Sequence, residues 1–135
     1  MIKRFISDWE KNKEDVRVAL TTAHPVSYKE IVKLVITAVS KDHDYDYPDP
    51  KRIHVIDDGD YQGTLLFVIG GQGYQPNDYY FVKVYYGSCS GCDTLQGISD
   101  YSNDPPTEGQ VKDYMTLALH IFQNLTSMQE DNEGV

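Results

Sequence analysis

A chain of 135 residues, of which 40% are hydrophobic and 24% are charged, is long enough for one globular domain with its own core. Its net charge of −9, from 21 acidic and 12 basic residues, argues against direct binding to nucleic acid, because no basic stripe is present to meet phosphates. No apolar run approaches the roughly 20 residues that a membrane span needs, and the charged N-terminal stretch lacks a signal-peptide core. We therefore expect a cytoplasmic protein whose partners include neither nucleic acid nor a membrane.

Two helices are expected at the start of the chain. Over residues 2–22 apolar side chains recur near helical spacing, and this helix should end before Pro25, because the residue that precedes a proline avoids the α region. Ser27 and Glu30 then form a capping-box pattern that opens a second helix, which should end near Ser40. The apolar positions of this second helix are numerous, so the pattern predicts a well-buried helix.

The segment 42–50 is rich in aspartate and proline, which predicts a loop. Aspartates alternate from Asp42 to Asp46, as calcium ligands do. An EF-hand loop that starts at Asp42 would need glycine at its sixth position and glutamate at its twelfth, where Tyr47 and Ile53 stand instead. A solvated acidic loop is the better interpretation.

Three strands should follow, at residues 52–56, 63–69 and 79–86, because these runs are rich in β-branched and aromatic side chains. The middle run is the most apolar and should be the central strand. Asp58-Gly59 allows the positive φ that a tight turn requires. The short connections predict an antiparallel meander.

The C-terminal part of the chain should be helical. Residues 93–98 follow a Gly/Ser turn as a short helix, and Thr107 starts a longer helix with a second capping box, which Gln110 completes. From Val111 to Leu125 the apolar residues recur at i, i+3, i+4 and i+7, the strongest helical pattern in the sequence. Residues 128–135 are typical of a flexible acidic tail.

These elements predict a single α+β domain over residues 1–127. It should contain two N-terminal helices, a three-stranded antiparallel meander, a short helix after the cysteine turn, and a C-terminal helix packed on the sheet. We expect the helices to lie on one face of this sheet. The opposite face should be exposed and tyrosine-rich, or buried in a homodimer.

Tyrosine is the compositional outlier, with 11 residues that concentrate between positions 45 and 101. A tyrosine presents a large apolar ring and a polar tip, which suits interfaces and ligand pockets. Aromatic cross-strand pairing in a sheet is the structural alternative. The candidate binding residues are Tyr74, Tyr79, Tyr85 and Tyr86, together with Ser88 and Asp93 in the adjoining turn.

Cys89 and Cys92 are the two cysteines of the chain and form a Cys-x-x-Cys pair between a strand and a helix start. A helix N-terminus lowers the thiol pKa in dithiol redox sites, but those sites belong to a βαβ unit, which this order of elements lacks. The spacing also suits half of a zinc site, yet no histidine pair completes it unless a dimer contributes two further cysteines. Small buried cysteines in a tight corner are the simpler interpretation, so zinc remains a speculative cofactor.

Two segments of the chain resemble a family of small uncharacterised bacteriophage and bacterial proteins. They are Tyr86–Gln96, YGSCSGCDTLQ, and Lys112–His120, KDYMTLALH. Asp60–Thr64 and Asn77–Tyr80 resemble this family as well, so the likeness covers about residues 50–125. The resemblance implies a phage-type accessory protein in the cytoplasm of a host cell, with no established activity and no catalytic residues.

No serine–histidine–acid set or carboxylate pair is suggested by local spacing, so we expect no enzyme. The leading hypothesis is a non-enzymatic accessory protein that binds a host protein through an acidic, tyrosine-rich surface and inhibits a host defence or nucleic-acid-handling enzyme. One alternative is a small-ligand protein for a nucleotide signal, with tyrosines that stack on the base, although basic residues for its phosphates are few. The other alternative is a thiol-redox or zinc protein built on Cys89 and Cys92.

Overall fold

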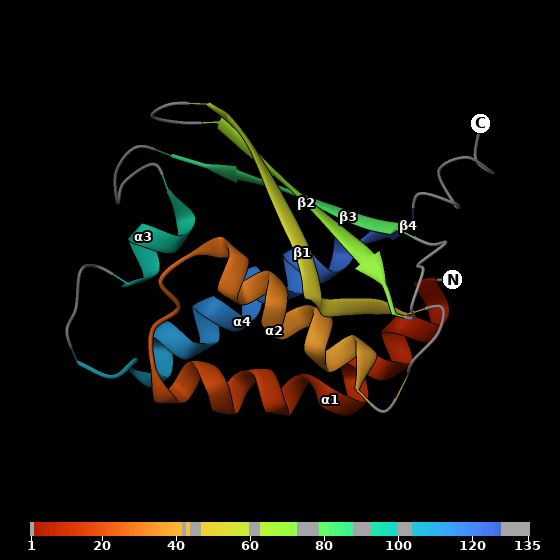
Figure 1. Ribbon diagram of the computed structural model, residues 1–135. Helices are drawn as coiled ribbons and strands as arrows, with labels where there is room; N and C mark the ends of the chain where they lie inside the picture. The colour runs from red at the N-terminus through yellow and green to blue at the C-terminus, as the bar shows by residue number, and fades with distance from the viewer. Residues whose placement is uncertain are drawn as a thin grey trace.

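The computed structural model describes residues 2–41, 43, 47–59, 63–72, 79–87, 93–99 and 104–127. The described residues form an α+β fold with four helices and one antiparallel sheet in the strand order β1-β2-β3-β4. Figure 1 shows α1, α2 and α4 together on one side of this sheet, as expected. In chain order the elements are α1 Ile2–Thr22, α2 Tyr28–Ser40, β1 Pro48–Gly59, β2 Gly63–Gly71, β3 Tyr79–Tyr86, α3 Thr94–Ser99, α4 Glu108–Gln123 and β4 Thr126–Ser127.

The core lies between the helices and the inner face of the sheet. Trp9 of α1 stacks on Phe122 of α4 with ring centroids 5.2 Å apart, and Phe5 of α1 packs against Tyr80 of β3 at 5.8 Å. Burial of these apolar side chains supplies most of the driving force for folding. The buried inner-face side chains of the strands are Ile53, Phe67, Ile69, Tyr80, Val82 and Val84.

Both expected capping patterns are present at the helix starts, with one difference. Thr107 Oγ1 accepts from the Gln110 N–H at 3.1 Å, and Gln110 Oε1 accepts from the Thr107 N–H at 2.9 Å, which completes a capping box. Ser27 Oγ accepts from the Glu30 N–H at 3.4 Å, but the Glu30 carboxylate accepts from the Val26 N–H, one residue before the cap. Each pair satisfies backbone donors that a helix N-terminus otherwise leaves without partners.

The first strand is longer than expected at both ends, so the prediction of a loop through Pro50 is wrong for its last three residues. The prediction of a turn at Asp58-Gly59 is wrong as well, because these residues pair with Thr64 and Gly63 of β2. β1 begins at Pro48 because it is an edge strand, where a missing N–H interrupts no ladder. The register shifts between Pro48 and Ile53, which is where the two prolines are accommodated. Ser40 at the end of α2 fixes this start by donating from Oγ to the Pro48 carbonyl at 2.5 Å.

The other strands agree with the sequence, apart from one addition. β3 has the expected bounds, and β2 lies between β1 and β3 as the central strand, with two residues more than expected. The prediction of three strands missed β4, in which Ser127 pairs with Tyr80 and Thr126 with Phe81. A strand of two residues carries no alternation pattern, which is why the sequence does not reveal it.

Some predictions fall outside the described residues. These are the acidic tail at 128–135 and the aspartates considered as calcium ligands, Asp42, Asp44 and Asp46. Of the helices that the structure describes, none combines the length and the hydropathy needed to cross a bilayer.

Candidate functional site

The sheet has a second face that none of the described helices covers (Figure 1). Because side chains alternate along a strand, the residues between the buried inward ones point to this side, which we call the outer face. Cross-strand register aligns them in rungs across the sheet. One rung is Ile56, Leu66 and Lys83, and the next is His54, Val68 and Phe81.

Apolar and aromatic side chains dominate this outer face. Ile56 is 56% exposed, whereas Leu66, Val68 and Phe81 are partly exposed in the middle of the sheet. Tyr79 is 43% exposed and Tyr85 is 76% exposed. Exposed apolar side chains that adjoin one another are typical of interaction surfaces. The outer-face patch consists of Ile56, Leu66, Val68, Tyr79, Phe81 and Tyr85.

The candidate tyrosines that the structure describes, Tyr79, Tyr85 and Tyr86, do not converge on one pocket. Tyr79 pairs with Gly70 and Tyr85 with Thr64, so the two lie at opposite ends of β3 on the outer face. Tyr85 is six steps along the strand from Tyr79, which puts their Cα atoms about 20 Å apart. Tyr86 points to the inner side instead. A broad contact surface fits this arrangement better than a clamp around one base.

The charge on the outer face differs from the overall charge of the protein. Lys83 and His54 are basic residues of this face, and the register places the acidic residue Asp58 opposite Thr64, in the rung of Tyr85. The expected surface was both acidic and tyrosine-rich. On the described outer face the tyrosines stand beside a lysine, while described carboxylates lie on the exposed sides of α1 and α4, at Glu14, Asp15, Glu108 and Asp113.

Asp93 is a buried carboxylate, 4% exposed, that joins three parts of the chain. Its Oδ2 accepts from the Gly87 N–H at 2.8 Å after β3, and its Oδ1 accepts from the Tyr28 hydroxyl of α2 at 2.9 Å. Oδ1 also accepts from the Gln96 N–H at 3.0 Å, which caps α3. These donors stabilise the buried carboxylate, and through it the two ends of the cysteine-bearing segment 88–92 are held together.

Tyr28 belongs to the same cluster. Its hydroxyl donates to Asp93 and accepts from the Leu95 N–H at 3.1 Å. Burial raises the pKa of Tyr28 to about 12; the Leu95 N–H opposes this, and the nearby Asp93 carboxylate adds to it. The hydroxyl therefore remains protonated, and keeps donating to Asp93, throughout the physiological pH range.

A crevice of about 270 Å³ opens beside this cluster. It lies between the start of α2, the inner side of the sheet and the start of α3, and Tyr86 and Asp93 both line it. The Tyr86 hydroxyl donates to Asp57 at 2.6 Å. Since Asp57 and Asp93 each already accept from a tyrosine hydroxyl, these contacts stabilise the corner of the fold. Sequence reasoning did not identify Tyr28 and Asp57, because only the tertiary pairing gives them this role.

The remaining candidate residues lie outside the described residues. These are Tyr74, Ser88, Cys89 and Cys92. Within the described ranges, no cluster of three or more histidine, cysteine, aspartate or glutamate side chains could hold a metal ion.

Comparison with protein-family models, with curated proteins and with solved structures found no match for this chain. The contacts of the described residues are therefore the basis for its function.

Proposed function

We propose that this protein is a non-enzymatic accessory protein that acts by binding a host protein through the outer-face patch. The observation that carries the proposal is the exposure of six adjoining apolar and aromatic side chains on a sheet face without a covering helix among the described elements. The opposite face of the same sheet packs against α2 and α4 and against Phe5 of α1. A partner surface would supply on the outer face what these helices supply on the inner one.

The gain from such contact comes from apolar area that loses water. The branched side chains of Ile56, Leu66 and Val68 and the ring of Phe81 adjoin one another, so a single partner surface can cover all of them. Removal of apolar surface from water is favourable by about 25 cal/mol for each Å², and the loss of translational and rotational freedom on association offsets part of this gain. Tyr85 adds a rigid ring with a hydroxyl that can remain at the wet rim of the contact.

The charge pattern specifies the partner further. Lys83 is exposed between apolar neighbours, and none of the ion pairs between described residues includes it. A partner that covers the patch must leave this ammonium group paired, because a buried unpaired charge is costly. We therefore expect an apolar partner surface that contains a carboxylate.

The resemblance to small bacteriophage proteins supports a partner from the host. Inhibition of a host defence or nucleic-acid-handling enzyme is the form of action that we propose. The location of such a partner would place this protein in the host cytoplasm.

The test is affinity capture from bacterial host lysate with three forms of the chain, followed by quantitative mass spectrometry. The double variant Ile56→Thr/Tyr85→Thr shortens two exposed side chains of the patch and keeps a residue that favours strands. The control is Val18→Thr, which changes a side chain on α1 that is 65% exposed. We expect one host protein to be retained by the wild type and by Val18→Thr and lost by the double variant. Equal retention by all three forms would refute the outer face as the contact.

A further inference from the structure

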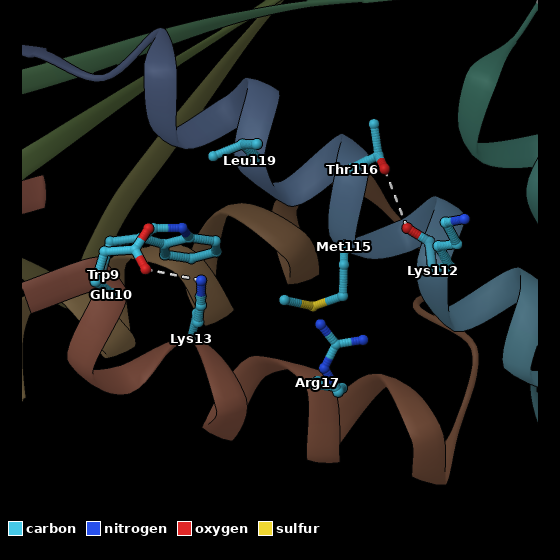
Figure 2. Close-up of a pocket in the computed structure, with 8 residues that line it drawn as sticks. All are labelled: Trp9, Glu10, Lys13, Arg17, Lys112, Met115, Thr116 and Leu119. Atoms are coloured by element: carbon cyan, nitrogen blue, oxygen red, sulfur yellow. Dashed lines mark hydrogen bonds and ion pairs between the residues drawn. The ribbon is translucent and has the colours of Figure 1, made fainter.

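Basic side chains gather where α1 packs against α4, although the protein has a net charge of −9. A pocket of about 250 Å³ lies between these helices, lined by Lys13 and Arg17 of α1 and by Lys112 of α4 (Figure 2). Glu10 is the one carboxylate among its lining residues, so the lining carries a net positive charge. The apolar lining residues are Trp9, Met115 and Leu119.

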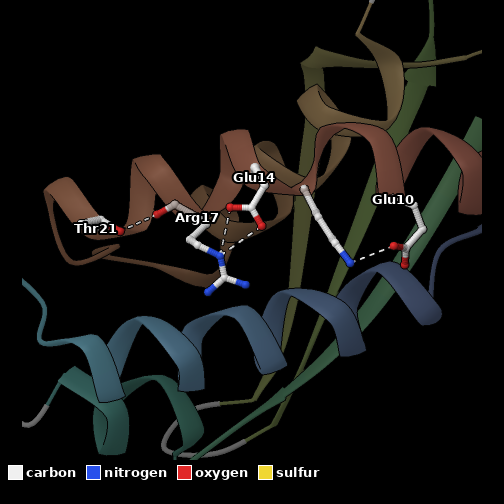
Figure 3. A network of polar contacts seen from close by, with 5 residues as sticks. Glu10, Glu14, Arg17 and Thr21 are labelled. Atoms are coloured by element: carbon white, nitrogen blue, oxygen red, sulfur yellow. Dashed lines mark hydrogen bonds and ion pairs between the residues drawn. The ribbon is translucent and has the colours of Figure 1, made fainter.

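The ion pairs that two of these cations form contribute little to stability. Lys13 Nζ lies 2.8 Å from Glu10, and Arg17 Nε lies 3.2 Å from Glu14, in pairs that are three residues apart on α1 (Figure 3). Every side chain in the two pairs is at least 36% exposed, and exposed pairs of this kind contribute little to stability. No ion pair between described residues includes Lys112. A ligand anion can therefore recruit all three cations at little cost.

The apolar part of the pocket is firmly held. Trp9 is 3% exposed and stacks on Phe122 with its ring only 10° from parallel, which fixes the floor. Met115 lies beside this floor, and Figure 2 shows the Arg17 guanidinium pointing toward it. Leu119 is 37% exposed and extends the apolar surface along α4. An anionic head group near Arg17 would thus have an apolar surface next to it.

We propose that this pocket binds a phosphomonoester that is attached to an apolar or aromatic body. A phosphomonoester carries about −1.5 to −2 charges at neutral pH and can accept two parallel hydrogen bonds from a guanidinium group. A carboxylate ligand carries one charge, as Glu10 and Glu14 already do, and gains less by displacing them. The phosphate binds between Arg17 and Lys112, and the body lies against Met115 and Leu119.

This site is independent of the outer-face patch. It offers a binding site for the nucleotide ligand considered in the sequence analysis. The sequence did not reveal this site, because Lys13 and Arg17 stand about 100 residues before Lys112. The tyrosines named for that hypothesis take no part in it. The base or another ring would pack on methionine and leucine side chains instead.

The experiment is an NMR titration of the ¹⁵N-labelled full chain with phenyl phosphate. We expect saturable shifts of the backbone amides of α1 and α4 around the pocket. Arg17→Gln and Lys112→Gln should each weaken binding about tenfold, as expected for a lost charge-assisted hydrogen bond at a partly exposed site. Lys29→Gln removes the same charge from the exposed side of α2 and should leave the affinity unchanged. Absence of saturable shifts at α1 and α4, or equal weakening by Lys29→Gln, would overturn the proposal.

Three further ligands separate the parts of the proposal. Inorganic phosphate and benzoate should both bind more weakly than phenyl phosphate; equal binding by either would overturn the requirement for both a phosphate and a body. AMP distinguishes the source of the phosphomonoester. Tighter binding of AMP than of phenyl phosphate would support the proposal with a nucleotide as ligand, and weaker binding of AMP would support it with a more compact ring. Binding should also fall as pH drops below about 6, where the phosphomonoester loses its second charge.

Discussion

At the scale of single residues, Asp93 stabilises the fold, because both of its carboxylate oxygens already accept hydrogen bonds. Gly87 donates to one oxygen, and Tyr28 and Gln96 donate to the other. The sequence pointed to Asp93 as a residue of the cysteine turn, and the structure gives the physical reason for an acid there. A carboxylate is the side chain that can accept on both sides while buried.

We expect Asp93→Asn to lower the free energy of unfolding by about 2 to 3 kcal/mol, because the amide nitrogen would face a donor and leave a buried N–H or hydroxyl without an acceptor. Urea denaturation measures this loss. Asp113→Asn is the matched control, since it removes the same charge from the exposed side of α4 and should change stability by less than about 0.5 kcal/mol. Similar losses in the two variants would show that charge, and not the hydrogen bonds, is responsible.

Because the pKa of Tyr28 is raised in the folded protein, we expect the free energy of unfolding to depend on pH. In the unfolded chain its hydroxyl loses the proton near pH 10, whereas in the folded protein its pKa is about 12. Between these values the unfolded state binds fewer protons, so the stabilisation that is complete below pH 10 is lost as pH rises to 12, by at most about 2 to 3 kcal/mol. Tyr28→Phe should flatten this decline, measured by urea denaturation at several pH values. Part of the decline in stability should remain in this variant, because burial also raises the pKa of Tyr114. A decline as steep as that of the wild type would contradict this role of Tyr28.

At the scale of elements, the helices follow from local sequence and the sheet follows only in part. The capping pair Thr107 and Gln110 and the periodic apolar residues of α4 act within one segment, so reading the segment suffices. β1 and β4 depend on neighbours far away in the chain. Pro48 can belong to β1 because β1 is an edge strand, which pairs with another strand on one side only. The two residues of β4 form a strand because they pair with β3.

The cap of α4 can be tested with the same substitution at two positions of the chain. Thr107→Ala removes the acceptor for the Gln110 N–H and should cost about 1 kcal/mol. Thr116→Ala lies within α4 and is exposed, so the higher helix propensity of alanine should leave stability unchanged or slightly raised. Thermal denaturation of both variants compares them directly. A larger loss in Thr116→Ala would be inconsistent with this account of the helix start.

The residues of the candidate sites could likewise be predicted from the sequence only where neighbouring positions in the chain determine them. Tyr79 and Tyr85 could be chosen from composition, and the alternation along one strand places them on one face. The sequence could not place Tyr86 against Asp57, or Arg17 near Lys112, because register and helix packing decide these contacts.

At the scale of the whole molecule, the sheet separates two surfaces of different character. The helical side carries the described carboxylates of α1 and α4 and the basic pocket between them, whereas the outer face is apolar and aromatic around Lys83. Charged side chains of both signs lie on the exposed sides of these helices, and such residues are depleted at the cores of protein interfaces. The uncovered sheet face (Figure 1) is then the surface best suited to a protein partner.

The most direct test of this account is photo-cross-linking in host cells from single benzophenone side chains. One chain carries the probe in place of Tyr85, which is 76% exposed on the outer face, and the other in place of Val18, which is 65% exposed on α1. We predict a specific adduct with one host protein from position 85 and none from position 18. Adducts of equal yield from both positions, or an adduct from position 85 whose mass is that of two copies of this chain, would contradict the proposal that the outer face binds a host protein.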